Sequence, residues 1–124
     1  MVYTKNGKTF RCPVEATLAV IGGKWKPLIL WEIGNGVMRF SELQKGLPGV
    51  NAKMLTKHLR ELEEDGVVLR KVYPEVPPRV EYSITPFGLT LLPVLRSLCD
   101  WGVQYLGVQE EPGSGCLGNP GTGK

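Results

Sequence analysis

The stretch NAKMLTKHLRELEEDGVVLRKVYPEVPPRVEYSIT, residues 51–85, decides the fold. Its first half has the leucine spacing of an amphipathic helix. Its second half has two runs of alternating apolar residues on either side of a proline-rich tip. The chain therefore passes from a helix directly into a long hairpin.

The helical half has two distinct faces. The apolar face holds Ala52, Leu55, Leu59 and Leu62, and the opposite face holds Lys53, Thr56, Lys57 and Arg60. Asn51 is expected to cap the first turn, and Gly66 to supply the left-handed residue that ends the helix. The acidic residues of the segment follow Arg60, so the first half is basic. This pattern fits a helix that reads DNA, and it also fits an ordinary amphipathic surface helix.

The hairpin favours the first interpretation. Strands are expected over VVLRKVY, residues 67–73, and RVEYSIT, residues 79–85, because Val80, Tyr82 and Ile84 alternate with polar residues. The tip between them, PEVPP, holds too many prolines to pair as a strand. A stiff tip with Pro77 and Pro78, and with Arg79 at its base, suits an adjacent DNA groove. The alternative is a plain capping hairpin.

The segments upstream complete a helix-turn-helix. A helix is expected from near Lys26 and Pro27 to Gly34–Gly36, with Leu28, Ile29, Trp31 and Ile33 available for a core. Arg39 and Phe40 form a short extended link. Ser41 with Gln44 predicts a capping box that opens the short helix SELQKGL. We expect Arg39 and Ser41 to hold the DNA backbone. The predicted fold is α+β and mainly α: a winged helix-turn-helix.

These segments together resemble the HxlR-type transcriptional regulators, a winged-helix group of bacteria related to the MarR regulators. The matching pieces are CPVEATLAVIGGKW (12–25), RFSEL (39–43), MLTKHLRELEEDGVVLR (54–70), VPPRVEYSIT (76–85) and PVLRSLCDWG (93–102). They run in unbroken order over roughly residues 12 to 102. The resemblance implies a dimeric DNA-binding repressor or activator, which in several members responds to electrophiles or oxidants. The tail after Gly107 departs from the shared pattern.

The last apolar segment predicts a dimerisation helix. Thr85 and Pro86 give a start signal, and Pro93 should kink the helix or delay its regular start. The apolar stripe is Leu91, Leu92, Leu95, Leu98, Cys99, Trp101, Gly102 and Tyr105, and it is broad for one small core. Symmetric pairing is the commonest way to bury such a stripe, so a homodimer on a palindromic operator is expected.

Length and composition bound the remaining possibilities. The 124 residues correspond to one domain, residues 1–107, followed by a glycine- and proline-rich tail, 108–124, that is expected to be disordered. The net charge is +3, with its most basic stretch in the first 26 residues. No apolar run is long enough to span a membrane, and no secretion signal opens the chain, so a cytoplasmic protein is expected.

No catalytic or cofactor site is predicted. The three cysteines are widely spaced and His58 is the only histidine, so neither a zinc site nor a disulfide framework is expected, and the thiols should be mainly reduced. His58 has no evident catalytic partner, and the fingerprints of nucleotide-binding loops are missing. An enzyme is therefore not expected, and no cofactor is proposed.

Cys12 is the candidate redox sensor. It precedes Pro13 and a helix, where the free amides and the helix dipole favour a thiolate, and Arg11 adds positive charge beside it. The resemblance strengthens this, because related regulators carry a cysteine at this place. The alternative is a cysteine that only packs at the helix entry.

The sequence thus predicts a dimeric, sequence-specific DNA-binding transcriptional regulator with an oxidant or a small molecule as a possible inducer. The rival from another class is a winged-helix protein-interaction module without specific DNA binding. A basic recognition face argues against the rival, whereas an acidic face would have supported it.

Overall fold

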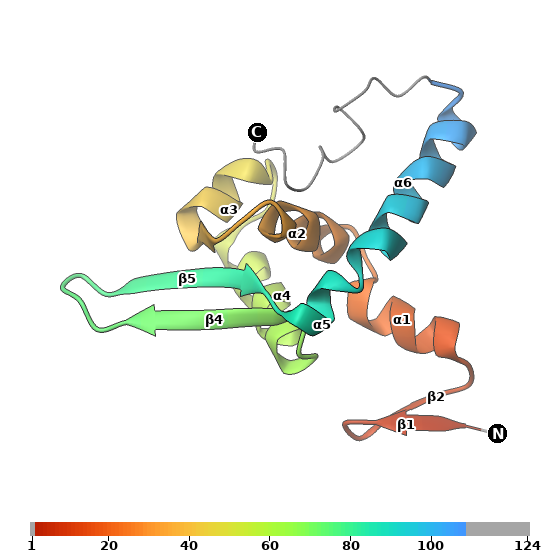
Figure 1. Ribbon diagram of the computed structural model, residues 1–124, viewed down its shortest axis with the longest axis horizontal. Helices are drawn as coiled ribbons and strands as arrows, with labels where there is room; N and C mark the ends of the chain where they lie inside the picture. The colour runs from red at the N-terminus through yellow and green to blue at the C-terminus, as the bar shows by residue number, and fades with distance from the viewer. Residues whose placement is uncertain (1, 109–124) are drawn as a thin grey trace.

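A computed structural model describes residues 2–108 of the chain, and Figure 1 shows its path. The helices are α1 (Pro13–Ile21), α2 (Trp25–Gly34), α3 (Phe40–Gly46), α4 (Ala52–Glu64), α5 (Pro86–Leu89) and α6 (Leu92–Leu106). The strands are β1 (Tyr3–Lys5), β2 (Lys8–Phe10), β3 (Met38–Arg39), β4 (Val68–Tyr73) and β5 (Arg79–Ile84). The predicted tail falls outside the described residues except for Val108.

The hairpin β4–β5 is the wing, and it projects from the helical body (Figure 1). Its strands pair antiparallel with Val68 opposite Ile84 and Tyr73 opposite Arg79. The two-residue strand β3 joins the other edge of β5, which gives the order β3-β5-β4. Because β3 lies between α2 and α3, this pairing attaches the helix-turn-helix to the wing. The predicted winged helix-turn-helix is confirmed.

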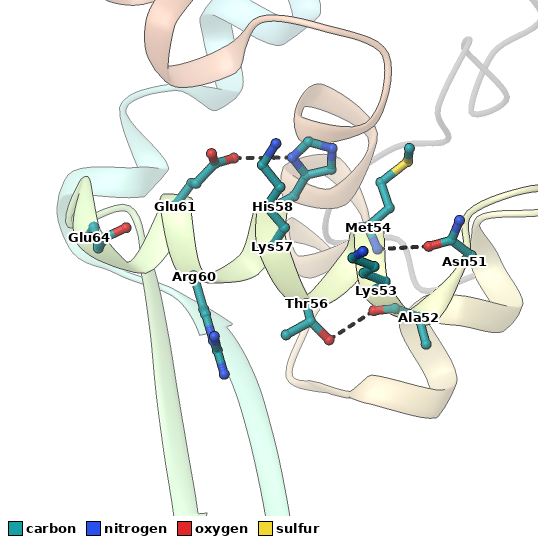
Figure 2. A pocket seen from close by; sticks show the side chains of 10 residues that line it. All are labelled: Asn51, Ala52, Lys53, Met54, Thr56, Lys57, His58, Arg60, Glu61 and Glu64. Atoms are coloured by element: carbon teal, nitrogen blue, oxygen red, sulfur yellow. Dashed lines mark hydrogen bonds and ion pairs between the residues drawn. The ribbon is translucent and has the colours of Figure 1, made fainter.

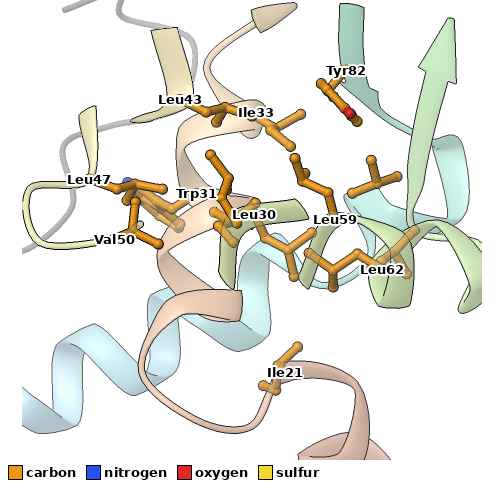
Figure 3. Packing of buried hydrophobic residues seen from close by; sticks show 14 of the residues in the cluster. Ile21, Leu30, Trp31, Ile33, Leu43, Leu47, Val50, Leu59, Leu62 and Tyr82 are labelled. Atoms are coloured by element: carbon orange, nitrogen blue, oxygen red, sulfur yellow. The ribbon is translucent and has the colours of Figure 1, made fainter. Parts of the chain in front are cut away.

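The core lies between α2, α4 and the wing (Figure 3). From α4 it takes Leu55, Leu59 and Leu62, which lie one turn apart and are buried as predicted. Ala52 is exposed, so its placement in the core was wrong. Ala52 is the first residue of α4, and the buried face of the helix begins one turn later at Leu55.

Helix α2 is apolar on most of its surface. Ile29, Leu30, Trp31 and Ile33 are all buried, and Leu28 is half-buried against the cluster. A helix with so little polar surface is a central element rather than a surface one. It therefore forms the hydrophobic centre on which α4, α6 and β5 pack.

Both ends of α4 are set by the predicted residues. The Asn51 side-chain oxygen accepts a hydrogen bond of 2.8 Å from the Met54 backbone amide. At the other end Gly66 has a φ of +79°, the left-handed conformation that glycine adopts without strain. Both ends of the helix are thus fixed by single residues.

The predicted cap of α3 was wrong. The helix begins at Phe40, with Arg39 as its N-cap residue, instead of opening at Ser41 with Gln44. The Arg39 backbone amide donates to the Glu42 carboxylate at 2.6 Å. A carboxylate binds a free amide more strongly than a neutral amide side chain does, so Glu42 determines the start.

A short helix precedes the last one. Thr85 starts α5, since its hydroxyl oxygen accepts from the Gly88 amide at 2.9 Å. The same hydroxyl donates to the Gly66 carbonyl at 2.7 Å, and the Thr85 amide donates to the Val67 carbonyl at 3.1 Å. Pro93 lies in the first turn of α6, so it delays the helix as predicted.

A second hairpin, β1–β2, was not predicted. Its turn residues Asn6 and Gly7 have φ values of +53° and +77°, as a type I′ turn requires. The signal was present in the sequence, because Asn-Gly between two short polar-apolar runs is a strong hairpin signal. The strands are only three residues long, and in Figure 1 the hairpin lies beside α1.

Candidate nucleic-acid interface

The outer surface of α4 is exposed and basic along its first half. Lys53, Lys57 and Arg60 are exposed, while the leucines on the other side hold the helix against the core. They border a broad hollow of about 910 Å³ whose lining runs from Asn51 to Glu64 (Figure 2). The acidic residues of the lining, Glu61 and Glu64, lie at the far end of the helix. The structure therefore collects the predicted reading residues of α4 on one surface.

Two of the polar residues on this surface are partly engaged in the fold. The Thr56 hydroxyl donates to the Ala52 carbonyl at 2.8 Å, which leaves its oxygen to accept from a ligand. The Asn51 oxygen is used in the helix cap, so its side-chain NH₂ is the part that can donate to a phosphate. Both residues stay at the basic end of the hollow.

An ionic cluster holds the acidic end of α4 on α2. Glu61 Oε1 lies 3.1 Å from Lys26 Nζ and 3.2 Å from His58 Nδ1. The Lys26 side chain is largely buried, so its charge requires a partner. Burial would raise the pKa of Glu61, but the hydrogen bonds from Lys26 and His58 and the charges of Lys26 and Lys57 outweigh it. The pKa of Glu61 therefore lies below its usual value.

The wing arginine is held by its own hairpin. Arg79 Nη2 lies 3.2 Å from Glu75, and Nη1 lies 3.7 Å from Glu81. The guanidinium also stacks on the Tyr73 ring, 3.9 Å from its centroid. Arg79 must leave two carboxylates before it can bind a phosphate. Its predicted DNA contact thus competes with contacts inside the wing.

The remaining predicted DNA contacts lie at two separate places. Pro77 and Pro78 are exposed at the wing tip, where the Val76–Pro77 peptide bond is cis. Arg39 and Ser41 are exposed at the start of α3. Arg39 is in register with Glu81 of β5, which places it beside the middle of the wing. The structure therefore groups Arg39 with the wing rather than with the middle of α4.

Sequence reasoning missed Arg70 on β4. It lines a polar hollow of about 260 Å³ together with Thr56, Arg60 and Glu63 of α4. Arg70 shares a strand face with the buried Val68, and this alternation directs it toward α4. The same alternation in VVLRKVY could have revealed it. Arg60 and Arg70 together make the junction of helix and wing positive.

The predicted dimer stripe divides into two parts. Leu95 is 2% exposed and Cys99 is also buried inside the protomer, while Leu91 and Leu92 pack on the core. Gly102 is half-buried. Leu98, Trp101 and Tyr105 are 54%, 64% and 75% exposed, and the two aromatic rings stack with centroids 5.3 Å apart. Only this second group, the exposed α6 face, is open to a partner.

Cys12 is a free, exposed thiol at the N-cap position of α1, as its sequence position predicted. Arg11 also pairs with an acidic residue, since its Nε lies 3.3 Å from the Glu15 carboxylate. Its positive charge is therefore shared between Glu15 and the Cys12 thiol. The expectation of reduced cysteines is wrong for Cys99, which is in a disulfide bond. Cys116 lies outside the described residues.

Residues 2–108 offer neither a metal site nor a membrane-spanning helix. In that part of the chain no group of His, Cys, Asp and Glu side chains could hold a metal ion. No helix in the same range is long and apolar enough to cross a bilayer.

Comparison with known proteins gives a consistent result. Residues 20–110 match the family described as HxlR-like helix-turn-helix. The HTH-type transcriptional regulator YdeP of Bacillus subtilis is 54% identical over 94 residues, which cover 76% of this chain and 73% of that protein. An HTH-type transcriptional regulator of Methanothermobacter thermautotrophicus is 48% identical over 104 residues, with 84% and 79% covered.

Solved structures agree in fold. The redox regulator HypR in its reduced form is 48% identical, with a TM-score of 0.74 over 77% of this chain and 94% of that one. Reduced YodB of Bacillus subtilis is 34% identical, with a TM-score of 0.68 over 77% and 95% of the two chains. Both similarities include sequence as well as fold.

Proposed function

Since the chain belongs to the HxlR-like helix-turn-helix family and is a transcriptional regulator of the HTH type, we propose that it acts as a homodimer on a specific double-stranded DNA site. The named relatives are transcriptional regulators and not enzymes, which points away from catalysis.

The basic outer surface of α4 is the observation that carries this proposal. Lys53, Lys57 and Arg60 are exposed on the side opposite the buried leucines, so they can meet DNA without disturbing the core. A helix of this kind fits the major groove, and long cationic side chains can bind guanine edges or phosphates there. Thr56 and Asn51 supply shorter polar contacts at the same surface.

The wing is proposed to extend this contact to the next groove. Arg70 joins Arg60 at the junction, while Pro77 and Pro78 form the tip. Arg79 contributes only after release from Glu75 and Glu81. Arg39 and Ser41 hold the DNA backbone beside α3. The helix thus gives most of the sequence recognition, and the wing gives mainly affinity.

Dimerisation is proposed through the exposed α6 face. Leu98, Trp101 and Tyr105 lie on one side of the helix and are exposed, and Leu106 is exposed at its end. Val14 and Leu18 of α1 are also exposed and can add to it. A two-fold pair of this kind places two copies of α4 on two half-sites, which predicts a palindromic operator.

Redox control is proposed through Cys12. Its thiol is exposed and free, and HypR is a redox regulator by name. With hydrogen peroxide, the Cys12 thiolate attacks one oxygen, the O–O bond breaks, and sulfenic acid and hydroxide are formed. The sulfur is oxidised and the peroxide oxygen is reduced. With a quinone, the thiolate would instead form a bond to a ring carbon, and uptake of one proton from water would give the hydroquinone thioether.

Selection from random DNA tests the proposal. The protein should enrich duplexes with two related half-sites under reducing conditions, and fewer after mild oxidation. Salt-labile binding without enrichment of any sequence would favour the rival, a winged-helix module that binds a protein. Enrichment that persists unchanged after oxidation would retain DNA binding and remove redox control.

A further inference from the structure

A cavity of about 350 Å³ lies between the hairpin β1–β2, helix α1 and the end of α4. Its size is within the range of about 300–1,000 Å³ that is usual for small-molecule sites. Most of the lining surface is apolar, with Phe10, Val20 and Phe87 contributing from three elements. The walls therefore come from parts of the chain that are far apart in sequence.

The hairpin wall has an aromatic end and a cationic end. Tyr3 is in register with Phe10, and Lys5 is in register with Lys8. All four line the cavity. Since partners in register lie on the same side of a hairpin, the two lysines stand side by side next to the turn.

That lysine pair favours an anion. Like charges directly opposite each other on two strands destabilise the pairing, and an anion between them would offset the repulsion. The carboxylate in the lining is Asp65, so the three charged residues of the lining give a net charge of +1. The charge pattern is complementary to one negative group at the turn end.

One side of helix α1 lines this cavity, and roughly the opposite side carries exposed apolar residues. Ala16, Ala19 and Val20 line the cavity, and their spacing puts them on one side of the helix. Val14 and Leu18 are exposed and lie two residues from Ala16, on roughly the opposite side. Filling the cavity therefore does not require any change on the other surface of α1.

We propose that this cavity binds a small planar aromatic molecule that carries a single negative charge. The aromatic body packs between Tyr3, Phe10 and Phe87, and the anionic group lies between Lys5 and Lys8. The two small alanines of α1 leave the room for the ring. This site is separate from the proposed DNA surface, and its binding does not depend on DNA.

Three probes of one shape test the site by titration calorimetry: 2-naphthoate, 2-naphthalenemethanol and 2-naphthylmethylammonium. We expect 2-naphthoate to bind at one site per protomer, more tightly than the neutral alcohol and the cation. No binding of 2-naphthoate, or tighter binding of the cation, would overturn the proposal.

Variants locate the binding. Ala19→Phe fills the cavity and should weaken 2-naphthoate binding by at least about tenfold, whereas Val37→Phe, at an exposed residue outside the lining, should leave it unchanged. The double change Lys5→Gln with Lys8→Gln leaves the volume intact and should weaken 2-naphthoate about threefold without affecting the alcohol. Equal affinities in the wild type and Ala19→Phe would place the binding elsewhere and refute the site.

Discussion

The carboxylate of Glu61 on α4 lies 3.1 Å from the ammonium of Lys26 on α2. This ion pair joins the proposed reading helix to the central helix of the core. His58 contacts the same carboxylate oxygen at 3.2 Å, so one acidic side chain holds two neighbours. The second half of α4 is therefore held on α2, and the basic first half stays free of this cluster.

The first prediction concerns acid stability. The pKa of Glu61 is lowered in the folded protein, so its contribution to stability is complete above the unfolded-state pKa and is lost as the pH falls through the folded value. Glu61→Gln should therefore be less stable than the wild type at neutral pH, and the difference should shrink below about pH 4. Urea unfolding at several pH values measures this difference in the free energy of unfolding. A difference that is constant with pH would contradict the ionic role.

The second prediction separates reading from folding on α4. Lys57→Ala or Arg60→Ala should leave the fold intact, since both side chains are exposed. Loss of a base contact should cost about 1–3 kcal/mol of binding and relax one operator position, while loss of a phosphate contact should lower the salt slope by about one. Leu59→Ala is the matched core change and should cost about 2–5 kcal/mol of stability. Unchanged operator binding in both surface variants would remove α4 from the interface.

The third prediction compares two arginines of the wing. Arg70 faces α4 beside Arg60, whereas Arg79 is bound to Glu75 and Glu81. Arg70→Ala should therefore weaken DNA binding and reduce the salt slope by about one, and Arg79→Ala should do less. Glu75→Gln should strengthen binding slightly, because it loosens Arg79. If Arg79→Ala has the larger effect at unchanged stability, Arg79 leaves its carboxylates to bind DNA.

The fourth prediction concerns the two sides of α6. Leu98→Glu changes the exposed α6 face and should give folded monomers that lose tight operator binding. Leu95→Glu puts a charge into the protomer core and should unfold the protein instead. Sedimentation and thermal melting distinguish the two outcomes. A folded, dimeric Leu98→Glu variant with full DNA affinity would exclude this surface from dimerisation.

The fifth prediction concerns Cys12. Hydrogen peroxide should modify Cys12 in the wild type and release DNA, as peptide mass spectrometry and a binding assay would show together. Cys12→Ser should bind its operator in both conditions. Equal loss of binding in wild type and Cys12→Ser would assign the oxidant response to another residue.

Local patterns predicted α4 and the wing well, because their determinants are close in sequence. Asn51 caps its own helix, and Gly66 ends it. The same approach failed where a distant contact decides. The apolar stripe of α6 did not show which side meets α2, so Leu95 and Leu98 looked equivalent. Nor did the positive charge of Arg79 reveal that Glu75 and Glu81 would meet it once the strands paired.

Thr85 connects the end of α4 to the segment that leads into α6. This residue binds Gly66 and Val67 at the end of α4, and it starts the segment that continues into α6. With 13 residues, α4 is about 20 Å long. A tilt of α4 by about 5° about Thr85 would move the basic end of the helix by about 2 Å. That displacement is larger than the range of hydrogen-bond lengths to a base allows. We expect small rotations of α6 against a partner to be amplified at the DNA.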